Sequence, residues 1–326
     1  TEAGGTDTFT VVLNAQPDSN VVLSIASSDT GEATVTGTVT FTPANWDTAQ
    51  TVTVTGADDD LVDGTVSSTT TISVVDAASD NNFDGVADQT VSVTTADDDV
   101  AGFTVSETEG STGVTEAGGT DTFTIVLNAQ PDTNVILSLI SGDTGEATVT
   151  SSLTFTSANW DTAQTVTVTG VDDHLVDGTE ISTITIAVVD VASDNNFDGV
   201  ADQTVSVSTT DDDVAGFTIV ELEGSTAVDE SGTTDTFTVV LNAQPDSDVV
   251  VAITSSDTGE ASSNSPLTFT SSNWDTAQTV TVTGVDDFLL DGTITSDLVV
   301  AIVDASSDNN FDGVADQTVS VSTTDD

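Results

Sequence analysis

The chain has 326 residues, 56 of them acidic, with one histidine and neither lysine nor arginine, so its formal net charge is −56. Because recognition of phosphate depends on Lys and Arg, nucleic acid is an implausible partner, and anionic membrane surfaces are disfavoured for the same reason. Cysteine is absent, so disulfides do not stabilise the fold. No apolar run approaches the roughly 20 residues of a transmembrane helix.

The high negative charge also limits the conditions under which the chain can fold. Since no side chain carries a permanent positive charge, internal salt bridges cannot neutralise the carboxylates. The chain either stays expanded by self-repulsion or takes up cations when it folds. High net charge with low hydrophobicity is typical of disorder. Here 36% of the residues are hydrophobic, and they alternate with Thr and Ser, which favours a folded chain that requires cations.

Short strands are the predicted elements throughout. In the middle of the chain, runs of alternating apolar and polar residues separated by Gly, Pro, Asn and Asp predict seven strands. In chain order these are residues 102–107, 121–128, 134–141, 152–155, 164–170, 182–190 and 203–210. The sequence TVTVT places Val166 and Val168 inward and the threonines outward. Phe123 and Trp160 are predicted core residues, and His174 a surface residue. Seven strands of this size form two packed antiparallel sheets.

The sequence repeats every 114 residues. The segment NWDTAQTVTVTG recurs around Trp46, Trp160 and Trp274. This period is too long for a solenoid and matches one β-sandwich domain of about 100 residues. We therefore predict an all-β chain of three tandem immunoglobulin-like antiparallel β-sandwich repeats. They are called here unit 1 (residues 1–99), unit 2 (residues 100–213) and unit 3 (residues 214–326).

Unit 1 has no counterpart of residues 101–114, which include the first predicted strand of unit 2. Two interpretations are open. The sequence is an excerpt from a longer array, or it belongs to a polymer in which a neighbouring chain supplies the first strand of unit 1.

One motif, DNNFDGVAD, has the spacing of a calcium-binding loop and occurs once in each unit. Oxygen ligands fall at positions 1, 3, 5 and 9, with glycine at position 6 for the turn and a backbone carbonyl at position 7. The Glu that an EF-hand has at position 12 is absent, so the motif predicts a related loop between strands. The alternative is an Asp- and Asn-rich turn that binds nothing. The predicted ligands are Asp80, Asn82, Asp84, Val86, Asp88, Asp194, Asn196, Asp198, Val200, Asp202, Asp308, Asn310, Asp312, Val314 and Asp316.

Two more acidic clusters accompany this motif. One is VDDHLVDGTE at residues 171–180, and the other is the run of three aspartates at the seams between units, residues 97–99 and 211–213. Adjacent carboxylates repel one another unless a cation lies between them. The seam therefore predicts a cation site, with a solvated spacer as the alternative.

The order of these acidic motifs resembles the Calx-β domain. It begins with E-x-G-G, followed by a strand, a D-D pair and a closing D-D-D, and LTFTSANWDTAQTVTVTGVDD is similar to bacterial adhesin-type repeats. That family is a calcium-binding immunoglobulin-like sandwich with its ions at one tip, found in sodium/calcium exchangers, integrin subunits and bacterial surface proteins. The resemblance implies calcium ligands at Glu116, Asp172, Asp173, Asp177, Glu180, Asp211, Asp212 and Asp213 in unit 2. It implies Glu2, Asp58, Asp59, Asp63, Asp97, Asp98 and Asp99 in unit 1, and Glu230, Asp286, Asp287, Asp291, Asp325 and Asp326 in unit 3. The position of Glu180 is Val66 in unit 1 and Ile294 in unit 3, which departs from the family pattern.

These features predict a calcium-stabilised structural segment, an extender or fibre, of a secreted or cell-surface bacterial adhesin or matrix protein. Several calcium ions per repeat and contacts between neighbouring repeats are expected. The alternatives are a module that binds a glycan or a protein, a filament subunit assembled by strand exchange, and a calcium sensor. Catalysis is not expected, because the acidic motifs recur in every unit and the histidine position is Asp60 in unit 1 and Phe288 in unit 3.

Overall fold

The alternation of valine and threonine determines which way the strands face. The structure is a computed structural model, and it describes residues 1–222, 224–286 and 289–326. In the strand at residues 164–170, Val166 and Val168 are fully buried, whereas Thr165 and Thr167 are exposed and Thr169 is half-buried. The inward and outward positions predicted for this strand are therefore confirmed. No helix of the described residues is long and apolar enough to cross a bilayer.

The strands and short 3-10 turns follow the repeat. In unit 1 they are β1 (Thr6–Val11), β2 (Val21–Ser27), β3 (Ala33–Val35), β4 (Thr38–Phe41), β5 (Gln50–Gly56), β6 (Val66–Val74), η1 (Asp76–Ala78), η2 (Asn81–Phe83) and β7 (Gln89–Thr95). In unit 2 they are β8 (Phe103–Glu107), η3 (Thr108–Gly110), β9 (Thr112–Thr115), β10 (Thr120–Leu127), β11 (Val135–Ser141), β12 (Ala147–Val149), β13 (Ser152–Phe155), β14 (Gln164–Gly170), β15 (Thr179–Val188), η4 (Asp190–Ala192), η5 (Asn195–Phe197) and β16 (Gln203–Thr210). In unit 3 they are β17 (Phe217–Glu221), β18 (Thr226–Asp229), β19 (Thr234–Leu241), β20 (Val249–Ser255), β21 (Ala261–Ser263), β22 (Leu267–Phe269), β23 (Gln278–Gly284), β24 (Thr293–Ile302), η6 (Asp304–Ser306), η7 (Asn309–Phe311) and β25 (Gln317–Thr324).

Each unit is a sandwich of two sheets. In unit 2 the sheets have the strand orders β12-β14-β10-β8 and β13-β11-β15-β16-β9, and unit 3 repeats this arrangement. The pairing is antiparallel, with Phe123 opposite Val166, except that β9 runs parallel to β16. The predicted all-β antiparallel sandwich is thus confirmed. The predicted strand number for unit 2 was wrong, because β9 and β12 hold only four and three residues and are too short for an alternating pattern to show.

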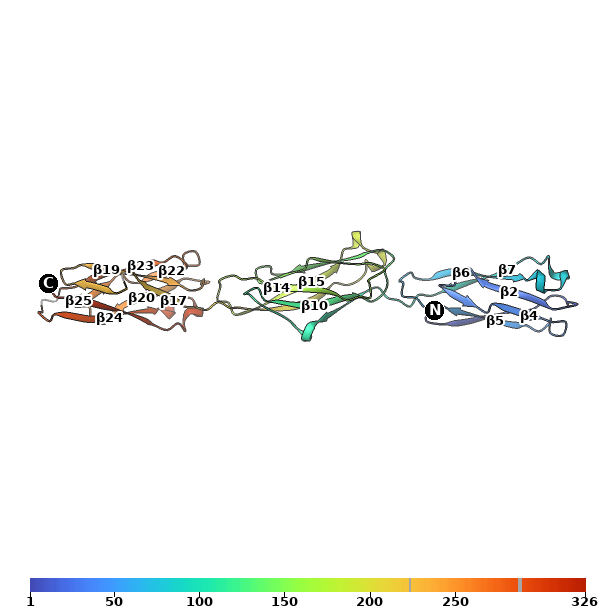
Figure 1. The fold of residues 1–326 in the computed structure, drawn as a ribbon, viewed down its shortest axis with the longest axis horizontal. Coiled ribbons are helices and arrows are strands. Elements are labelled where there is room, and N and C mark those ends of the chain that lie inside the picture. The colour runs from blue at the N-terminus through green and yellow to red at the C-terminus, as the bar shows by residue number, and fades with distance from the viewer. Residues whose placement is uncertain (223, 287–288) are drawn as a thin grey trace.

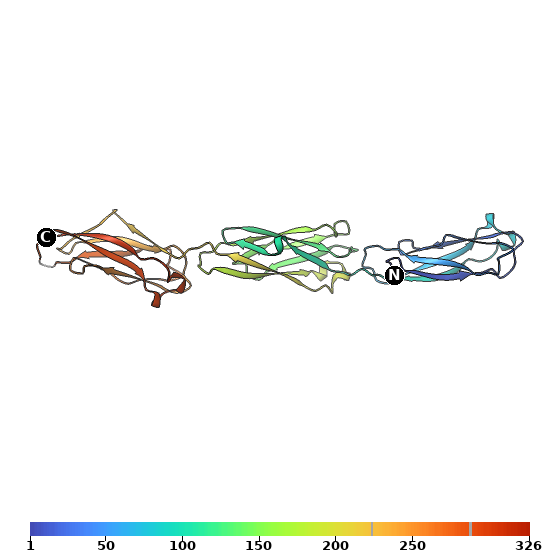
Figure 2. The same ribbon diagram turned by 90° about the horizontal axis from the view of Figure 1, so that it is seen from below.

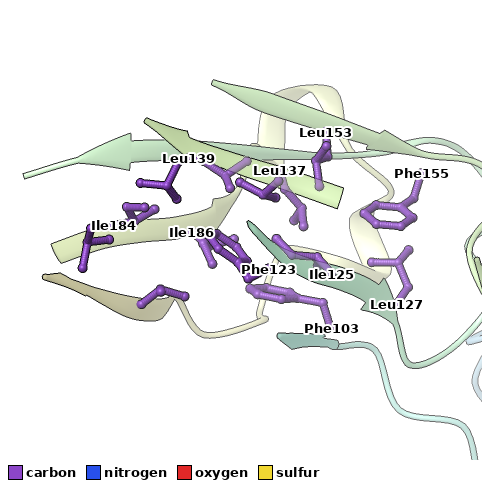
Figure 3. Packing of buried hydrophobic residues seen from close by; sticks show 14 of the residues in the cluster. Phe103, Phe123, Ile125, Leu127, Leu137, Leu139, Leu153, Phe155, Ile184 and Ile186 are labelled. Atoms are coloured by element: carbon purple, nitrogen blue, oxygen red, sulfur yellow. The ribbon is translucent and has the colours of Figure 1, made fainter. Parts of the chain in front are cut away.

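The core of unit 2 lies between the two sheets. Phe123, Ile125 and Leu127 of β10 face Leu137 and Leu139 of β11 and the isoleucines of β15 (Figure 3). Each side chain of this kind contributes about 1.5–3 kcal/mol when it is fully removed from water. The prediction for Phe123 is confirmed, since its side chain is fully buried. Trp160 packs against this core but remains partly exposed.

The three sandwiches lie end to end in one row, as both views of the ribbon show (Figures 1 and 2). The N-terminus lies at the end of unit 1 that faces unit 2, and the C-terminus lies at the outer end of unit 3 (Figure 1). All three units therefore point in the same direction along the row. The end of a unit that carries its E-x-G-G turn and closing aspartates is called its tip below.

Unit 1 differs from the other two in its sheets. Its sheets have only three and four strands, β1-β5-β3 and β4-β2-β6-β7. In the described chain no strand takes the places that β8 and β9 hold in unit 2. The outer edges of β1 and β7 are consequently without a neighbouring strand.

Candidate metal centre

A tight turn at the tip of unit 2 places one glutamate inside the sandwich. Directly after β9, the backbone N–H of Glu116 donates to the carbonyl of Thr210 at 3.1 Å, and Gly119 N–H returns to the carbonyl of Thr115 at 3.0 Å. Gly118 adopts φ +79°, which favours glycine. The Glu116 side chain is 1% exposed, and its Oε2 has no hydrogen-bond partner. A buried carboxylate oxygen without a partner is costly unless a cation lies beside it.

Two groups of carboxylates meet at this glutamate. Ligand oxygens of Glu116, Asp173 and Asp213 lie within 4.8 Å of one another, and so do those of Glu116, Glu146 and Asp177. In unit 1 one group is the exact counterpart, Glu2, Glu32 and Asp63, whereas the other consists of Glu2, Asp97 and Asp99, with Asp97 at the position of Asp211 rather than that of Asp173. The tip of each of these two units therefore holds two adjacent ligand groups that share one buried glutamate.

The first aspartate of the closing run holds the cluster in place. Asp211 Oδ2 accepts from the backbone N–H groups of Asp177 and Gly178 at 3.1 and 2.9 Å, and its Oδ1 accepts from that of Asp213 at 2.7 Å. Asp97 makes the same three bonds to residues 63, 64 and 99 in unit 1. This carboxylate ties the D-D loop to the seam, so that segments about 35 residues apart present their side chains together.

The carboxylates at the tip are held against their own repulsion. Burial, followed by the charges of Asp177 and Asp173, raises the pKa of Glu116 to about 7. Burial and the charges of Asp59 and Asp63 raise the pKa of Glu2 to about 7 in the same way. The pKa values of Glu32, Asp63, Asp99, Glu146, Asp177 and Asp213 are raised as well, with burial as the first cause for each.

The composition of the cluster fits a hard divalent cation. Two carboxylates about 4.8 Å apart repel by roughly 3 kcal/mol at an effective dielectric constant near 20, and the chain has no lysine or arginine to offset this. The ligand groups consist of oxygens and contain no thiol, which suits calcium or magnesium rather than zinc. Calcium takes six to eight oxygens in flexible geometry, so several convergent carboxylates suit it best.

Glu146, the residue directly before β12, was missed in the sequence analysis. Its counterparts are Glu32 and Glu260, and all three side chains are buried or half-buried. The signal that could have revealed them is DTGEA, which is identical in the three units at the 114-residue spacing. A single acidic residue in a turn looks like ordinary surface, whereas its burial shows only when β12 is placed beside β14.

Other residues predicted as ligands lie around the rim of the tips. Asp58, Asp98, Asp172, Glu180 and Asp212 are exposed, and Asp172 forms an outer group with His174 and Asp213. In unit 3, Glu230 is buried, Asp286, Asp291 and Asp326 are exposed, and Asp325 accepts from Gly292 N–H at 2.6 Å. Asp287 lies outside the described residues. The two ligand groups are thus described for units 1 and 2.

The DNNFDGVAD loop belongs to neither ligand group of its own unit, although its Asn196 reaches the tip of the preceding unit, and it has a different local chemistry. Asp194 is buried, and its carboxylate accepts from the backbone N–H groups of Thr133 at 2.8 Å and Asn196 at 3.0 Å. In unit 1, three such bonds lower the pKa of Asp80. Asp198 and Asp202 are exposed. The first aspartate therefore caps the η5 turn and joins it to the preceding loop.

We expect Asp194→Ala to lower the free energy of unfolding of unit 2 by about 2–4 kcal/mol, since it removes two hydrogen bonds to a buried charge. Asp198→Ala, in the same loop but exposed, should leave this free energy nearly unchanged. Urea unfolding followed by circular dichroism measures both. A neutral Asp194→Ala would contradict the capping role.

The same pair of variants tests the calcium loop predicted from the sequence. If an ion is bound by the Asp194–Asp202 loop, calorimetric titration with calcium will find one ion fewer in Asp198→Ala. If the loop only shapes the chain, the ion count will be that of the unaltered protein.

Comparison with known proteins gives likenesses of fold. No model of a known protein family matches the chain, and no curated protein matches it. Domains 4–9 of the surface layer protein SbsC are similar at 19% identity over 93% of this chain and 39% of that one, with a TM-score of 0.30. The chain thus spans about two fifths of that structure's length.

Two further solved structures have similar sandwiches. CBD12 from CALX1.2 is 14% identical, with 60% of this chain and 79% of that one covered and a TM-score of 0.26. The D0-D1 domain of intimin is 18% identical, with 68% and 97% covered and a TM-score of 0.24. At these TM-scores the likenesses do not establish membership of a family or a function.

Proposed function

We propose that this chain is a calcium-stiffened extender of an extracellular or cell-surface protein. The observation that carries the proposal is the buried glutamate shared by two carboxylate groups at each described tip, Glu2 in unit 1 and Glu116 in unit 2. Both carboxylate oxygens of Glu2, and Oε2 of Glu116, lack the hydrogen bonds that a buried carboxylate requires. Bound calcium would supply the positive charge that the sequence does not contain.

The residues that would hold calcium in unit 2 are Glu116, Glu146, Asp173, Asp177 and Asp213. Asp211 acts as a positioning residue, because its oxygens already accept three backbone hydrogen bonds. With ions bound, the repulsion within the cluster becomes attraction to a shared cation. The free energy of calcium binding then adds to the free energy of folding.

The tip of one unit touches the base of the next. At the junction of units 1 and 2, Gln130 N–H donates to the carbonyl of Asp60 at 2.7 Å, and the side-chain amide of Asn196 donates to the carbonyl of Val62. The second junction repeats both contacts, from Gln244 to His174 at 2.6 Å and from Asn310 to Val176. His174 also lies against Trp274, with 5.6 Å between ring centroids.

These contacts connect calcium to the stiffness of the row. Asp60, Leu61 and Val62 lie between two ligand candidates of unit 1, Asp59 and Asp63. Asp132 of unit 2 is close enough for its charge to raise the pKa of Asp63, and Asp246 does the same to Asp177. An ion that orders the loop therefore orders the segment on which the next unit rests, and it relieves repulsion across the junction.

An outside location follows from the chemistry of such sites. Calcium sites of extracellular modules have dissociation constants of about 10⁻⁴–10⁻³ M, which the calcium concentration outside cells fills and that of the cytosol does not. The partners of the chain in this proposal are calcium and the neighbouring repeats. A spacer of this kind holds a distal domain away from a surface.

Distance measurements between spin labels test whether calcium stiffens the row of units. Because the chain has no cysteine, Ser92→Cys and Ser206→Cys, at equivalent exposed positions of β7 and β16, give a unique label pair across the first junction. We expect one narrow distance distribution with calcium and a broad one in EGTA. A distribution that stays narrow in EGTA would show that calcium does not stiffen the junction.

A substitution of Asn196 tests the contribution of the junction contact to stiffness separately from ion binding. Asn196→Ala should broaden the distance distribution in calcium without changing the number of ions bound. Asn195→Ala, at the neighbouring exposed residue, should leave both the distribution and the number of ions unchanged. If Asn196→Ala left the distribution narrow, the Asn196–Val62 contact would not contribute to the stiffness.

A further inference from the structure

The junction between units 2 and 3 brings an aspartate of each unit into register. Leu175 of unit 2 forms a parallel β-bridge with Gln244 of unit 3, and the backbone N–H of Gln244 donates to the carbonyl of His174 at 2.6 Å. Side chains alternate along an extended chain, so residues two positions beyond a parallel bridge leave both segments on the same side. Asp177 and Asp246 hold these two positions.

The loop that carries Asp246 is fixed within unit 3. Pro245, directly before it, is buried. Asp308, itself buried, accepts through Oδ2 from the backbone N–H of Ser247 at 2.9 Å, and its own N–H donates to the carbonyl of Asp248 at 3.0 Å. The backbone on both sides of Asp246 is therefore held, while its side chain is exposed.

The same aspartate connects this loop to unit 2. Asp308 Oδ1 accepts from the backbone N–H of Asn310 at 3.0 Å, and the side-chain amide of Asn310 donates to the carbonyl of Val176. Val176 directly precedes Asp177. Two neighbouring side chains of one short turn therefore hold Asp246 of unit 3 beside Asp177 of unit 2.

Asp177 is also the ligand candidate of its group that lies nearest the junction. Its oxygens and those of Glu116 and Glu146 lie within 4.8 Å of one another, and Asp177 Oδ1 is buried with no hydrogen-bond partner among the described residues. Burial, then the charges of three carboxylates of unit 2 and that of Asp246, raise the pKa of Asp177. Calcium takes six to eight oxygens, so a group of three carboxylates leaves room for a further ligand.

The junction between units 1 and 2 repeats this arrangement. Leu61 is bridged to Gln130, which puts Asp63 and Asp132 in register. The Asp194 carboxylate accepts from the backbone N–H of the residue after Asp132 at 2.8 Å. Burial, then the charges of two carboxylates of unit 1 and that of Asp132, raise the pKa of Asp63. The facing pair of aspartates is thus a feature of both junctions.

We propose that the following unit supplies a carboxylate ligand to the ion at each of these two tips, Asp132 at the tip of unit 1 and Asp246 at the tip of unit 2. This ligand role rests on the proposed binding of calcium at the tips and makes the next unit a partner in it. A site whose ligands come from two units is complete only when the units are docked. Calcium binding and docking therefore strengthen each other by the same factor.

The loop of unit 3 contains a matched control for this role. Asp248 lies two residues beyond Asp246 and is exposed as well. Its counterpart in unit 2 is Asn134, whereas the counterpart of Asp246 is again an aspartate, Asp132. Asp248→Asn therefore removes the same charge from the same loop without removing the proposed ligand.

A calcium titration of the whole chain tests the proposal. Spin labels at Ser206→Cys and Ser320→Cys, equivalent exposed positions of β16 and β25, report on the junction of units 2 and 3. The calcium concentration at which their distance distribution narrows should rise about tenfold in Asp246→Asn, because one carboxylate ligand is lost. Asp248→Asn should leave it nearly unchanged, and Asp246→Glu, which keeps a carboxylate, should recover part of the loss.

The first junction gives the reciprocal result. With labels at Ser92→Cys and Ser206→Cys, Asp132→Asn should raise the calcium concentration required for narrowing, and Asp246→Asn should not. This pattern assigns each aspartate to the tip that it faces.

Failure of the trans ligand can be told apart from failure of the calcium-stiffened row. If the unaltered chain narrows its distribution with calcium, but Asp246→Asn requires no more calcium than Asp248→Asn, each tip binds its ion without the next unit and the trans ligand is refuted. If Asp246→Asn requires less calcium, this aspartate only repels the tip, which refutes the ligand role as well. If the unaltered chain does not respond to calcium at all, the trans ligand and the proposed function are both overturned.

Discussion

Removal of calcium should lower the midpoint of thermal unfolding by roughly 10–35 °C, the largest effect expected for this chain. Two ions per tip with dissociation constants of about 10⁻⁴–10⁻³ M stabilise the folded state by roughly 2–5 kcal/mol at about 5 mM calcium. For a domain of this size, each kcal/mol moves the midpoint by about 4–8 °C.

The physical reason is that the sequence has no lysine or arginine to neutralise the carboxylates at the tips. In the proposed mechanism, the carboxylates around Glu2 and Glu116 share an ion when calcium is bound. Without it, they repel one another inside a tip that partly excludes water, as the raised pKa values of both glutamates reflect. Circular dichroism during heating, in EGTA and after calcium is added back, measures the difference.

Magnesium is the control for this experiment. Magnesium prefers strict octahedral geometry and keeps several waters, so a cluster of flexible carboxylates should bind it less well. The midpoint should therefore rise much less with magnesium than with calcium. An unchanged midpoint in EGTA would mean that the acidic tips are solvated turns, and the proposed extender mechanism would be abandoned.

Glu116→Gln should have opposite effects with and without calcium. Glutamine keeps the shape of the side chain but carries no charge. In EGTA at pH 8 the variant should be more stable than the unaltered protein, because a buried, repelled carboxylate has been removed. In calcium it should be less stable, because both ligand groups of unit 2 lose their shared oxygen ligand.

The pH dependence follows from the same residue. The folded-state pKa of Glu116 is about 7, above the ordinary value of 4.5, so the folded state holds this proton more tightly than the unfolded state. Without calcium, the stability from the neutral carboxyl is fully present below pH 4.5 and is lost as the pH rises through about 7. Glu116→Gln should flatten this slope.

Urea unfolding in EGTA at pH 5 and pH 8 measures the slope. Glu180→Gln is the matched control, since Glu180 lies at the same tip but is exposed. It should change neither the free energy of unfolding in EGTA nor the slope of that free energy with pH by much. If Glu116→Gln were less stable than the unaltered protein in EGTA at pH 8 too, the buried carboxylate would be a structural hydrogen-bond acceptor and not an ion ligand.

Much of the fold could be predicted from local patterns. The 114-residue repeat and the alternation in segments such as QTVTVTG indicate a β-sandwich array, because side-chain direction in a strand depends only on sequence position. β9 and β12 could not be predicted in this way. They are short, and they exist because the strands beside them, β16 and β14, offer backbone groups for pairing.

The candidate site could be predicted only in part. In units 1 and 2 the E-x-G-G turn, the D-D loop and the closing aspartates lie at the same end of the sandwich. Which of them converge could not be predicted. Asp173 and Asp213 point to Glu116, whereas Asp172, Glu180 and Asp212 are exposed. Asp211 is occupied by backbone hydrogen bonds.

By itself the sequence predicts that folding requires cations, because 56 acidic residues and no lysine or arginine leave no internal way to balance the charge. It also determined the β-strand repeat. The tertiary structure alone decided which carboxylates form a cluster, since Glu116, Glu146 and Asp177 are distant in the chain and meet only when β9, β12 and the loop before β15 reach the same tip. Burial there, and not the residue type, separates a ligand candidate from a solvated aspartate.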